Sequence, residues 1–328
     1  MPRIVRFHQT GSPDVLQIEE VELPPPGPGE VRIRVKALGL NRAEALFRSG
    51  RYLETPRLPA RLGYEAAGTV EAVGQGVQGF RAGDVVSTIP AFSQNQYGVY
   101  GEVATVPATA LAKHPSSLSW IEAAAIWMQY FTAYGALIDL GHLEKGETVL
   151  VSAASSSVGI AAIQIARMVG ATPIALTRGA GKRQALLDAG AGAVIVTSEQ
   201  DVVAEVGRVT GGKGARVVFD PVGGPGIVHL AAAMSERGTL FLYGALSTEP
   251  TPLPPALLSR SLTIRGFMLF EVTTDPARLA AGKEFIVGGL SSGKLKATVA
   301  KTFSLDQIVE AHRYLESNQQ VGKIVVTV

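Results

Sequence analysis

The distribution of apolar residues changes along the chain and is most regular in its middle part. There, short apolar runs alternate with longer segments whose apolar residues recur at helical spacing. The runs predict a first strand that begins at Thr148 and five more at 172–177, 193–196, 216–220, 238–244 and 262–268, with helices at 181–189, 200–210 and 224–234. Strands and helices in this alternation form a doubly wound parallel sheet with helices on both faces. Six strands is the number in a complete dinucleotide-binding fold.

The first predicted strand leads into a turn of small residues, Ala-Ala-Ser-Ser-Ser-Val-Gly at 153–159, and an amphipathic helix follows. Small side chains let a pyrophosphate approach the backbone, and the helix N-terminus offers free N–H groups and the positive end of a dipole. Of the three usual glycines only Gly159 is present; Ala153 or Ala154, and Ser156, take the other places. Such a turn also occurs in proteins without nucleotide, but at the head of six ordered strands it predicts a dinucleotide site. The expected contacts are Ala154, Ser155, Ser156, Ser157, Val158 and Gly159.

The end of the second strand indicates which dinucleotide binds. A site for NADH places Asp or Glu about 20 residues after the turn, where the carboxylate binds the ribose 2′-hydroxyl. Here the strand ends at Thr177, and no carboxylate occurs before Asp188. The cations that stand there instead include Arg178 and Lys182, which would bind the 2′-phosphate of NADPH. We therefore expect NADPH, with Thr177, Arg178 and Lys182 beside it; the alternative is that these are solvated cations at a helix start.

The chain before residue 120 has a different pattern, in which short valine-rich runs are separated by glycine-containing turns. These runs predict strands at 30–37, 67–73, 84–88 and 102–106. Short strands at irregular spacing are typical of a β-barrel. One helix is predicted to interrupt it, from Arg42 to Ser49, with Asn41 as its cap.

The last part of the chain, after residue 268, is predicted to contain two helices and two strands. The sequence predicts a helix near 276–293, a strand, a helix at 305–317 opened by the capping box Ser304–Gln307, and a final strand, Lys323–Val328. We expect these segments to rejoin the β domain, so that the nucleotide domain is inserted within it. The expected domains are residues 1–122 together with 269–328, and residues 123–268.

Composition restricts the class of protein. The chain has 328 residues, of which 46% are hydrophobic, and a formal net charge of +2. This length suggests two domains with well-developed cores, and the balanced charge gives no reason to expect nucleic acid. No stretch approaches the about 18 apolar residues of a membrane span and no secretory signal is recognisable, so we expect a cytoplasmic protein. The absence of cysteine excludes disulfides, thiol nucleophiles and cysteine-bound zinc.

Several segments in a fixed order carry a resemblance to a known family. They are Asn41 and Glu44 before 48–52, LGYEAAG at 62–68, Val73-Gly74, Gly83-Asp84, Thr132–Tyr134, the turn at 149–159, Phe219–Gly224 and Gly322–Val325. Over essentially its whole length the chain resembles the medium-chain dehydrogenase/reductase superfamily, specifically its zinc-independent quinone oxidoreductase branch. The resemblance implies an α/β fold in which a Rossmann domain is inserted in a GroES-like β-barrel domain. It also implies a homodimer, which we expect to form through the edge strand at 262–268.

Two positions separate this chain from the zinc alcohol dehydrogenases of the same superfamily. Those enzymes have a cysteine near position 41 and a histidine in Gly-His-Glu, whereas this chain has Asn41 and Gly63-Tyr64-Glu65. The five histidines show no ligand spacing, so we expect no bound zinc and no Lewis-acid activation of substrate. Within the branch, Asp is commoner than Glu at position 44, and the nucleotide turn is usually richer in glycine.

The resemblance implies roles for residues of the β domain. Asn41 is expected near the nicotinamide or its ribose, although a helix cap also explains it. Tyr52 is expected to donate a hydrogen bond to a substrate carbonyl. Tyr64 should fill the emptied metal position, either as packing or as a second substrate contact. Glu65 is expected to be a buried structural carboxylate, and Lys323 either a cofactor contact or a solvated charge at a sheet edge.

The resemblance also implies cofactor contacts in the nucleotide domain. Thr132 is expected to hydrogen-bond the nicotinamide carboxamide, with helix packing as the alternative. Asp220 either meets the ligand at a strand end or caps a turn. The remaining expected contacts follow predicted strands: Tyr243, Gly244, Phe267 and Met268.

The chemistry that these expectations describe is hydride transfer to a quinone or to the β-carbon of an enone. Such acceptors are already electrophilic, so positioning and one hydrogen bond to the developing oxyanion supply most of the rate. Two alternatives are a reductase that acts chiefly on acyl thioesters or alkenals, and a non-catalytic NADPH-binding protein like the lens crystallins of this branch. A turnover assay with NADPH and a small quinone distinguishes the enzyme from the binder.

Overall fold

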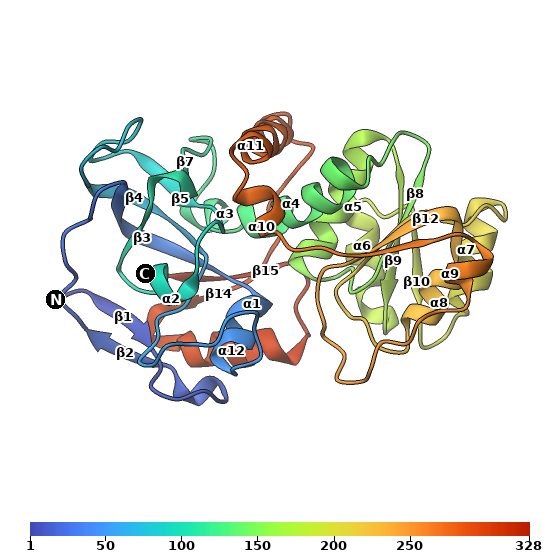
Figure 1. Ribbon diagram of the computed structural model, residues 1–328, viewed down its shortest axis with the longest axis horizontal. Helices are drawn as coiled ribbons and strands as arrows, with labels where there is room; N and C mark the ends of the chain where they lie inside the picture. Colours follow the sequence, from blue (N-terminus) through green and yellow to red (C-terminus); the bar gives the residue numbers. More distant parts are fainter. The chain divides into compact units, whose positions relative to one another are not determined.

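The computed structural model describes all 328 residues, which divide into two compact units (Figure 1). Unit 1 comprises Met1–Met128 and Ala297–Val328, and unit 2 comprises Gln129–Lys296. Unit 2 is thus inserted in unit 1, and the last two strands of the chain join the sheet of unit 1. The expected fold class, a six-stranded parallel domain inserted in a β-rich domain, is confirmed.

Unit 1 is built around β3 (Glu30–Leu40), which pairs with three other strands. Val31, Ile33 and Val35 of β3 are buried while the cations between them are not, which is the period-2 pattern of a strand with one face in the core. The sheet has the order β14-β15-β3-β4-β5-β7, with β6 beside β3. Its other strands are β4 (Glu65–Val73), β5 (Val85–Thr88), β6 (Val103–Pro107), β7 (Leu111–Ala112), β14 (Val299–Ser304) and β15 (Lys323–Thr327).

Helices and a small second sheet complete unit 1. β1 (Arg3–Arg6) and β2 (Gln17–Glu20) form an antiparallel pair. The helices are α1 (Arg42–Arg48), α2 (Gln94–Tyr97), α3 (Trp120–Ala123) and α12 (Ile308–Ser317). The predicted capping box before α12 is present, because Ser304 N donates to the Gln307 side chain at 3.1 Å. The chain passes from unit 1 to unit 2 within α4 (Trp127–Tyr134).

Unit 2 contains a wholly parallel sheet of six strands in the order β10-β9-β8-β11-β12-β13. The strands are β8 (Thr148–Val151), β9 (Thr172–Thr177), β10 (Ala193–Val196), β11 (Ala215–Asp220), β12 (Met234–Leu242) and β13 (Thr263–Gly266). The helices are α5 (Ser157–Val169), α6 (Arg183–Asp188), α7 (Val202–Thr210), α8 (Ile227–Ala232), α9 (Ala256–Ser259), α10 (Phe270–Thr273) and α11 (Pro276–Ser291). All six predicted strands are present. The chain order reverses between β8 and β11, which is the point where ligands bind in such sheets.

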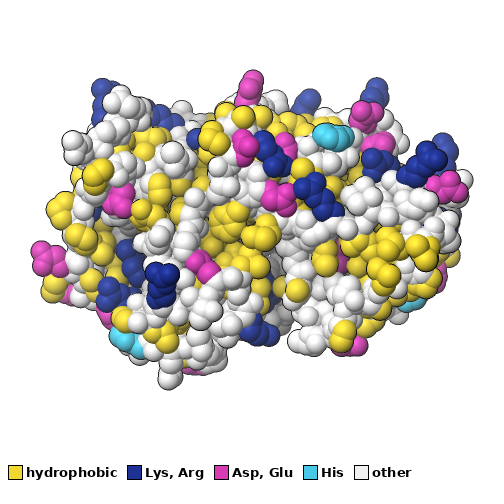
Figure 2. All heavy atoms as spheres, viewed as in Figure 1, with side chains coloured by type: hydrophobic (Ala, Val, Ile, Leu, Met, Phe, Trp, Pro, Cys, Tyr) yellow, Lys and Arg dark blue, Asp and Glu magenta, His cyan; other side chains and the backbone are white.

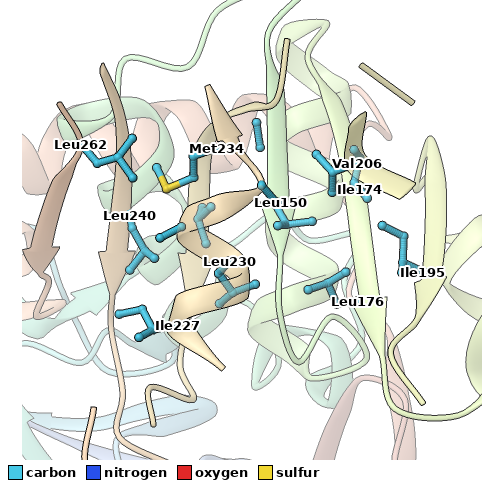
Figure 3. Close-up of a cluster of buried hydrophobic side chains, with 14 residues drawn as sticks. Leu150, Ile174, Leu176, Ile195, Val206, Ile227, Leu230, Met234, Leu240 and Leu262 are labelled. Carbon is cyan, nitrogen blue, oxygen red and sulfur yellow. The ribbon is translucent and has the colours of Figure 1, made fainter. Parts of the chain in front are cut away.

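The core on one face of this sheet is aliphatic. Leu150, Ile174 and Leu240 project from strands, and Ile227 and Leu230 of α8 pack against them (Figure 3). Because helices cover both faces of a parallel sheet, its strands are continuous apolar runs and not alternating ones. This property made the strands recognisable in the sequence.

Charged side chains of both signs are interspersed on the face shown in Figure 2, in keeping with the formal net charge of +2. The chain therefore presents on this face no field of one sign of the kind that draws in a polyanion. None of its helices combines the length and the apolar character that crossing a membrane requires.

A buried histidine in unit 1 is expected to make stability depend on pH. His312 of α12 packs edge-on against Tyr100 with 5.9 Å between ring centroids, and neither ring nitrogen has a hydrogen-bond partner. Burial, followed by the charges of Arg48 and Arg42, lowers the pKa of His312 from 6.5 to about 3. The unfolded chain therefore binds the proton more tightly, so this contribution to stability is complete above pH 6.5 and is lost as the pH falls toward 3.

When the pH falls from 6.5 to about 5, we expect the free energy of unfolding to drop by about 2 kcal/mol less in His312→Leu than in the wild type. The reason is that one proton bound only by the unfolded chain changes this free energy by about 1.4 kcal/mol per pH unit. Urea unfolding at the two pH values measures the difference. His229→Leu, at an exposed position of α8, is the control and should behave like the wild type. An unchanged pH dependence in His312→Leu would contradict the prediction.

Candidate active site

In unit 2 the turn between β8 and α5 is tightly bent. Ala153 has a φ of +44°, the left-handed conformation that glycine usually supplies at the first place of a dinucleotide-binding turn. Ser156 caps α5 by accepting the Gly159 N–H at 3.0 Å. A Cβ on Gly159 would lie 2.6 Å from Ala154 Cα, so only glycine lets the helix approach the turn this closely. Ala153, and not Ala154, therefore takes the place of the first glycine.

Two cations lie close to each other beside this turn. Lys182 Nζ donates to Ser155 Oγ at 3.2 Å, and the pKa of Lys182 is lowered first by burial and then by the charge of Arg178. Lys182 is half-buried, so it is not merely a solvated cation at a helix start. Thr177 is buried at the end of β9, and Arg178 after it is exposed. A bound anion would relieve the repulsion between the two charges, which fits the predicted 2′-phosphate site.

The other residues expected at the cofactor in unit 2 follow neighbouring strands. Tyr243 comes directly after β12, and its ring stacks on Phe219 of β11 with centroids 4.0 Å apart. Its hydroxyl is buried, and Gly244 follows Tyr243 in the chain. After β13, Phe267 is buried and Met268 is 44% exposed. These residues thus lie at the carboxyl edge of the sheet, as their positions after predicted strands led us to expect.

Asp220 is a turn cap. Its carboxylate accepts the N–H groups of Val222 at 3.1 Å and Gly223 at 2.8 Å, and it also binds the Ser152 hydroxyl. The structure therefore favours the cap over a direct ligand contact for this residue.

Thr132, the residue expected at the nicotinamide carboxamide, lies in α4 and is 7% exposed.

In unit 1 the side chains around Asn41 form a buried charged cluster. Lys323 Nζ donates to Asn41 Oδ1 at 2.5 Å and forms an ion pair with Glu65. Asn41 Nδ2 lies 3.2 Å from Glu65 Oε2 and 3.1 Å from Glu44 Oε1. None of the four residues is more than 8% exposed. The expectation of Lys323 as a solvated edge charge is therefore wrong, because β15 lies inside the sheet between β14 and β3.

One ammonium in this cluster faces two carboxylates. Glu65 also accepts the Met128 N–H at 2.8 Å, which makes it the structural carboxylate that we expected. Glu44 accepts the N–H groups of Asn41 at 2.7 Å and Tyr64 at 3.2 Å. Burial raises the pKa of Glu44 to about 7, against the opposing effects of Lys323 and Asn41. Glu44 lies three residues after the cap Asn41, and this spacing is the only feature of the sequence that indicates its place in the cluster.

Tyr52 and Tyr64 lie next to each other in unit 1. Tyr64 Oη donates to Tyr52 Oη over a long hydrogen bond of 3.5 Å, and the ring centroids are 6.4 Å apart. Tyr64 is fully buried with its ring against Phe92, whereas Tyr52 is half-exposed. Burial raises the pKa of Tyr52 to about 12, so its hydroxyl keeps its proton at neutral pH and can donate it in a hydrogen bond.

The two positions at which the resemblance implies zinc ligands in the alcohol dehydrogenases carry an amide, Asn41, and a phenol, Tyr64, in this chain. No group of three or more His, Cys, Asp or Glu side chains is arranged to hold a metal ion. The buried histidines instead contact neighbours in unit 1: His114 Nδ1 lies 3.1 Å from Ser87 Oγ, and His312 packs against Tyr100.

Comparison with known proteins gives a consistent result over the whole chain. Residues 27–116 match the alcohol dehydrogenase GroES-like domain, and residues 157–283 match the zinc-binding dehydrogenase family. The chain is 34% identical over 323 residues to a quinone oxidoreductase of Salmonella typhimurium, with 97% of each chain covered. A Pseudomonas syringae quinone oxidoreductase superposes with a TM-score of 0.92 at 30% identity, with both chains fully covered. The Escherichia coli quinone oxidoreductase, solved in complex with NADPH, gives 0.91 at 32% identity, covering 99% of this chain and 100% of that one.

Proposed function

Since the chain belongs to the medium-chain dehydrogenase/reductase superfamily, in its zinc-independent quinone oxidoreductase branch, we propose that it reduces quinones or α,β-unsaturated carbonyl compounds with NADPH. The names of its relatives support this, as does the NADPH complex of the Escherichia coli protein. The observation in this chain that carries the proposal is the pair of cations, Arg178 and Lys182, beside the turn that ends at Gly159.

The residues of unit 2 fit a dinucleotide. Gly159 lets α5 pack closely on the turn, so that the start of α5 lies where a pyrophosphate would bind, and the expected contacts there are Ala154, Ser155, Ser156, Ser157 and Val158. Arg178 and Lys182 would bind the 2′-phosphate, with Thr177 beside them. The nicotinamide half would meet the remaining expected residues: Thr132, Tyr243, Gly244, Phe267 and Met268. When bound, NADPH supplies a hydride from C4 of its nicotinamide.

The residues of unit 1 are proposed to serve the substrate. Tyr52 would donate a hydrogen bond to the carbonyl oxygen that gains charge during reduction, a role supported by its protonated, half-exposed hydroxyl. Asn41 would lie near the nicotinamide or its ribose, and Lys323 would keep its amide in place. Tyr64 would hold Tyr52 in place through its ring contact and the hydrogen bond from its hydroxyl. A quinone or enone needs no stronger acid, because it is already electrophilic.

We expect NADPH to bind at least about tenfold more tightly than NADH, since one charge-assisted phosphate contact is worth roughly 1.5–3 kcal/mol. Titration of both cofactors against the wild type and Arg178→Ala/Lys182→Ala measures the preference. The double variant should lose the preference and retain its affinity for NADH. Equal affinities in the wild type would remove the basis for assigning NADPH.

A turnover assay tests the catalytic part of the proposal. NADPH oxidation in the presence of a small quinone or an enone supports the enzyme, whereas tight binding without turnover indicates a binding protein. Acyl thioesters and alkenals belong in the same screen. A cytoplasmic location is part of the proposal, because a reductase of this kind consumes the NADPH pool of that compartment.

We further propose a homodimer formed through unit 2. β13 is the edge strand of the sheet, and an unpaired edge invites pairing with its symmetry mate. Leu258 of α9, just before β13, is 85% exposed. We expect light scattering at micromolar concentration to give a dimer for the wild type and a monomer for Leu258→Asp. Leu187→Asp, at an exposed leucine of α6, is the control and should remain a dimer.

A further inference from the structure

The loop that carries Tyr52 is attached to a short helix more than thirty residues further along the chain. Glu54, two residues after Tyr52, accepts the Gln94 N–H at 2.9 Å and the Asn95 amide Nδ2 at 3.1 Å. It also binds the hydroxyl of Ser93, the N-cap of α2. One carboxylate therefore makes three contacts with the start of α2.

Asn95 completes the attachment from the other side. Its Oδ1 accepts the Arg57 N–H at 2.7 Å, and its Nδ2 donates to Thr55 O at 3.0 Å. On the near side of Tyr52, the Arg51 N–H donates to Leu46 O of α1 at 2.9 Å. The backbone on both sides of Tyr52 is thus fixed by hydrogen bonds, none of which involves the Tyr52 hydroxyl.

The same short helix also reaches the second tyrosine. Gln94 Oε1 accepts the Gly63 N–H at 2.8 Å, which fixes the orientation of its amide and leaves Nε2 as the group available to donate. Gln94 lowers the pKa of Tyr64, while burial, the dominant effect, raises it. A Tyr64 oxygen that faces a donor keeps its own proton for Tyr52, in agreement with the direction of the hydrogen bond between the two hydroxyls.

From these contacts we infer that Glu54 is a positioning residue that, through the start of α2, holds the Tyr52 hydroxyl where it can donate to a substrate carbonyl. The inference rests on the proposed function. Glu54 is half-buried, and its negative charge raises the pKa of both tyrosines, which further keeps their protons in place. Glu54 itself touches neither substrate nor cofactor in this role.

The first test is a double-mutant cycle between positions 54 and 52. We expect Glu54→Gln to lower kcat/KM for an enone by on the order of ten- to a hundredfold, mostly in kcat, because small displacements of a catalytic group are costly. In the Tyr52→Phe background the same change should have almost no effect, since no hydroxyl remains to be positioned. Asn95→Ala should follow the same pattern. Glu205→Gln, whose carboxylate binds Arg208 on its own helix, is the matched control and should be silent. An equal loss in both backgrounds would overturn the inference.

The second test does not depend on turnover. The protein, labelled with 3-fluorotyrosine at its eight tyrosines, gives ¹⁹F resonances in which the Tyr52 signal is identified by its absence from Tyr52→Phe. We expect Glu54→Gln to shift or broaden that signal and to leave those of Tyr130 and Tyr243 in unit 2 unchanged. An unmoved Tyr52 signal would overturn the inference. If the wild type reduces neither quinones nor enones, the proposed function fails, and this spectrum still decides whether Glu54 positions Tyr52.

Discussion

Replacing Lys323 by methionine is expected to lower the free energy of unfolding by about 3–5 kcal/mol, the usual cost of removing one partner from a buried ion pair. Lys323 Nζ is the cation that faces both Glu65 and Glu44, and all three side chains are buried. Without it, Glu65 would carry an uncompensated charge and Asn41 would lose its donor at Oδ1. No other substitution proposed for this chain should affect stability as strongly.

Urea unfolding followed by circular dichroism measures this loss. Lys213→Met, at an exposed position after α7, is the matched control and should change stability little. Lys323→Met/Glu65→Gln should recover part of the loss, because it removes the charge that was left unpaired. If Lys323→Met were as stable as the control, the ion pair would contribute nothing to the fold of unit 1.

The loss should also depend on pH in a defined direction. Burial raises the pKa of Glu44 from 4.5 to about 7, so its contribution to stability is complete below pH 4.5 and is lost as the pH rises through 7. Lys323 opposes that shift, so the pKa of Glu44 should be higher in Lys323→Met. The deficit of the variant should therefore be larger at about pH 8 than at about pH 6. A deficit that is the same at both values would show that Glu44 does not respond to Lys323.

Tyr52→Phe is expected to lower kcat/KM for an enone on the order of 150-fold, equivalent to about 3 kcal/mol, with NADPH affinity nearly unchanged. Reduction of an enone builds charge on one carbonyl oxygen, where a hydrogen-bond donor helps most. A quinone spreads the charge over a ring that becomes aromatic, so the decrease in kcat/KM for a quinone should be smaller. Steady-state kinetics with both substrates measures the difference.

Tyr314→Phe serves as the control. Tyr314 lies in α12, and its ring packs against Phe303 of β14 and not against Tyr52. It should leave both rates unchanged. If enone turnover in Tyr52→Phe stayed within about threefold of the wild type, Tyr52 would not be the oxyanion donor. Positioning and solvent would then be sufficient, and Asn41 would be the next side chain to test.

The parallel sheet of unit 2 could be predicted in detail, and the reason is physical. Its strands are buried on both faces and follow one another as β-α units, so each appears as a separate apolar run in sequence order. Within this sheet, the predicted and the observed strands differ at their ends. The last strand, predicted over 262–268, spans Thr263–Gly266, and β12 begins at Met234, four residues before the predicted start. Strand ends depend on hydrogen bonds to neighbours, which apolar periodicity does not record.

The candidate cofactor contacts in unit 2 could be predicted from the sequence for the same reason. The turn before Gly159 and the cations Arg178 and Lys182 each occupy a short stretch of chain next to a predicted strand. Because the carboxyl ends of parallel strands meet at one edge, their sequence positions imply their proximity. The structure added a detail that depends on backbone conformation, namely that Ala153 takes the left-handed place of the first glycine.

The sequence by itself therefore determined the fold class, the six-stranded sheet and the position of the nucleotide turn, because these follow from local periodicity and chain order. Only the tertiary structure decided how the residues of unit 1 act on one another. Lys323 meets Glu65 across 258 residues and Asn41 across 282, and Glu54 meets Gln94 across 40. Such contacts depend on how antiparallel strands and loops of unit 1 pack, and no spacing in the sequence encodes them. For that reason a lysine that could have been a solvated edge charge proved to be the buried counter-ion of two carboxylates.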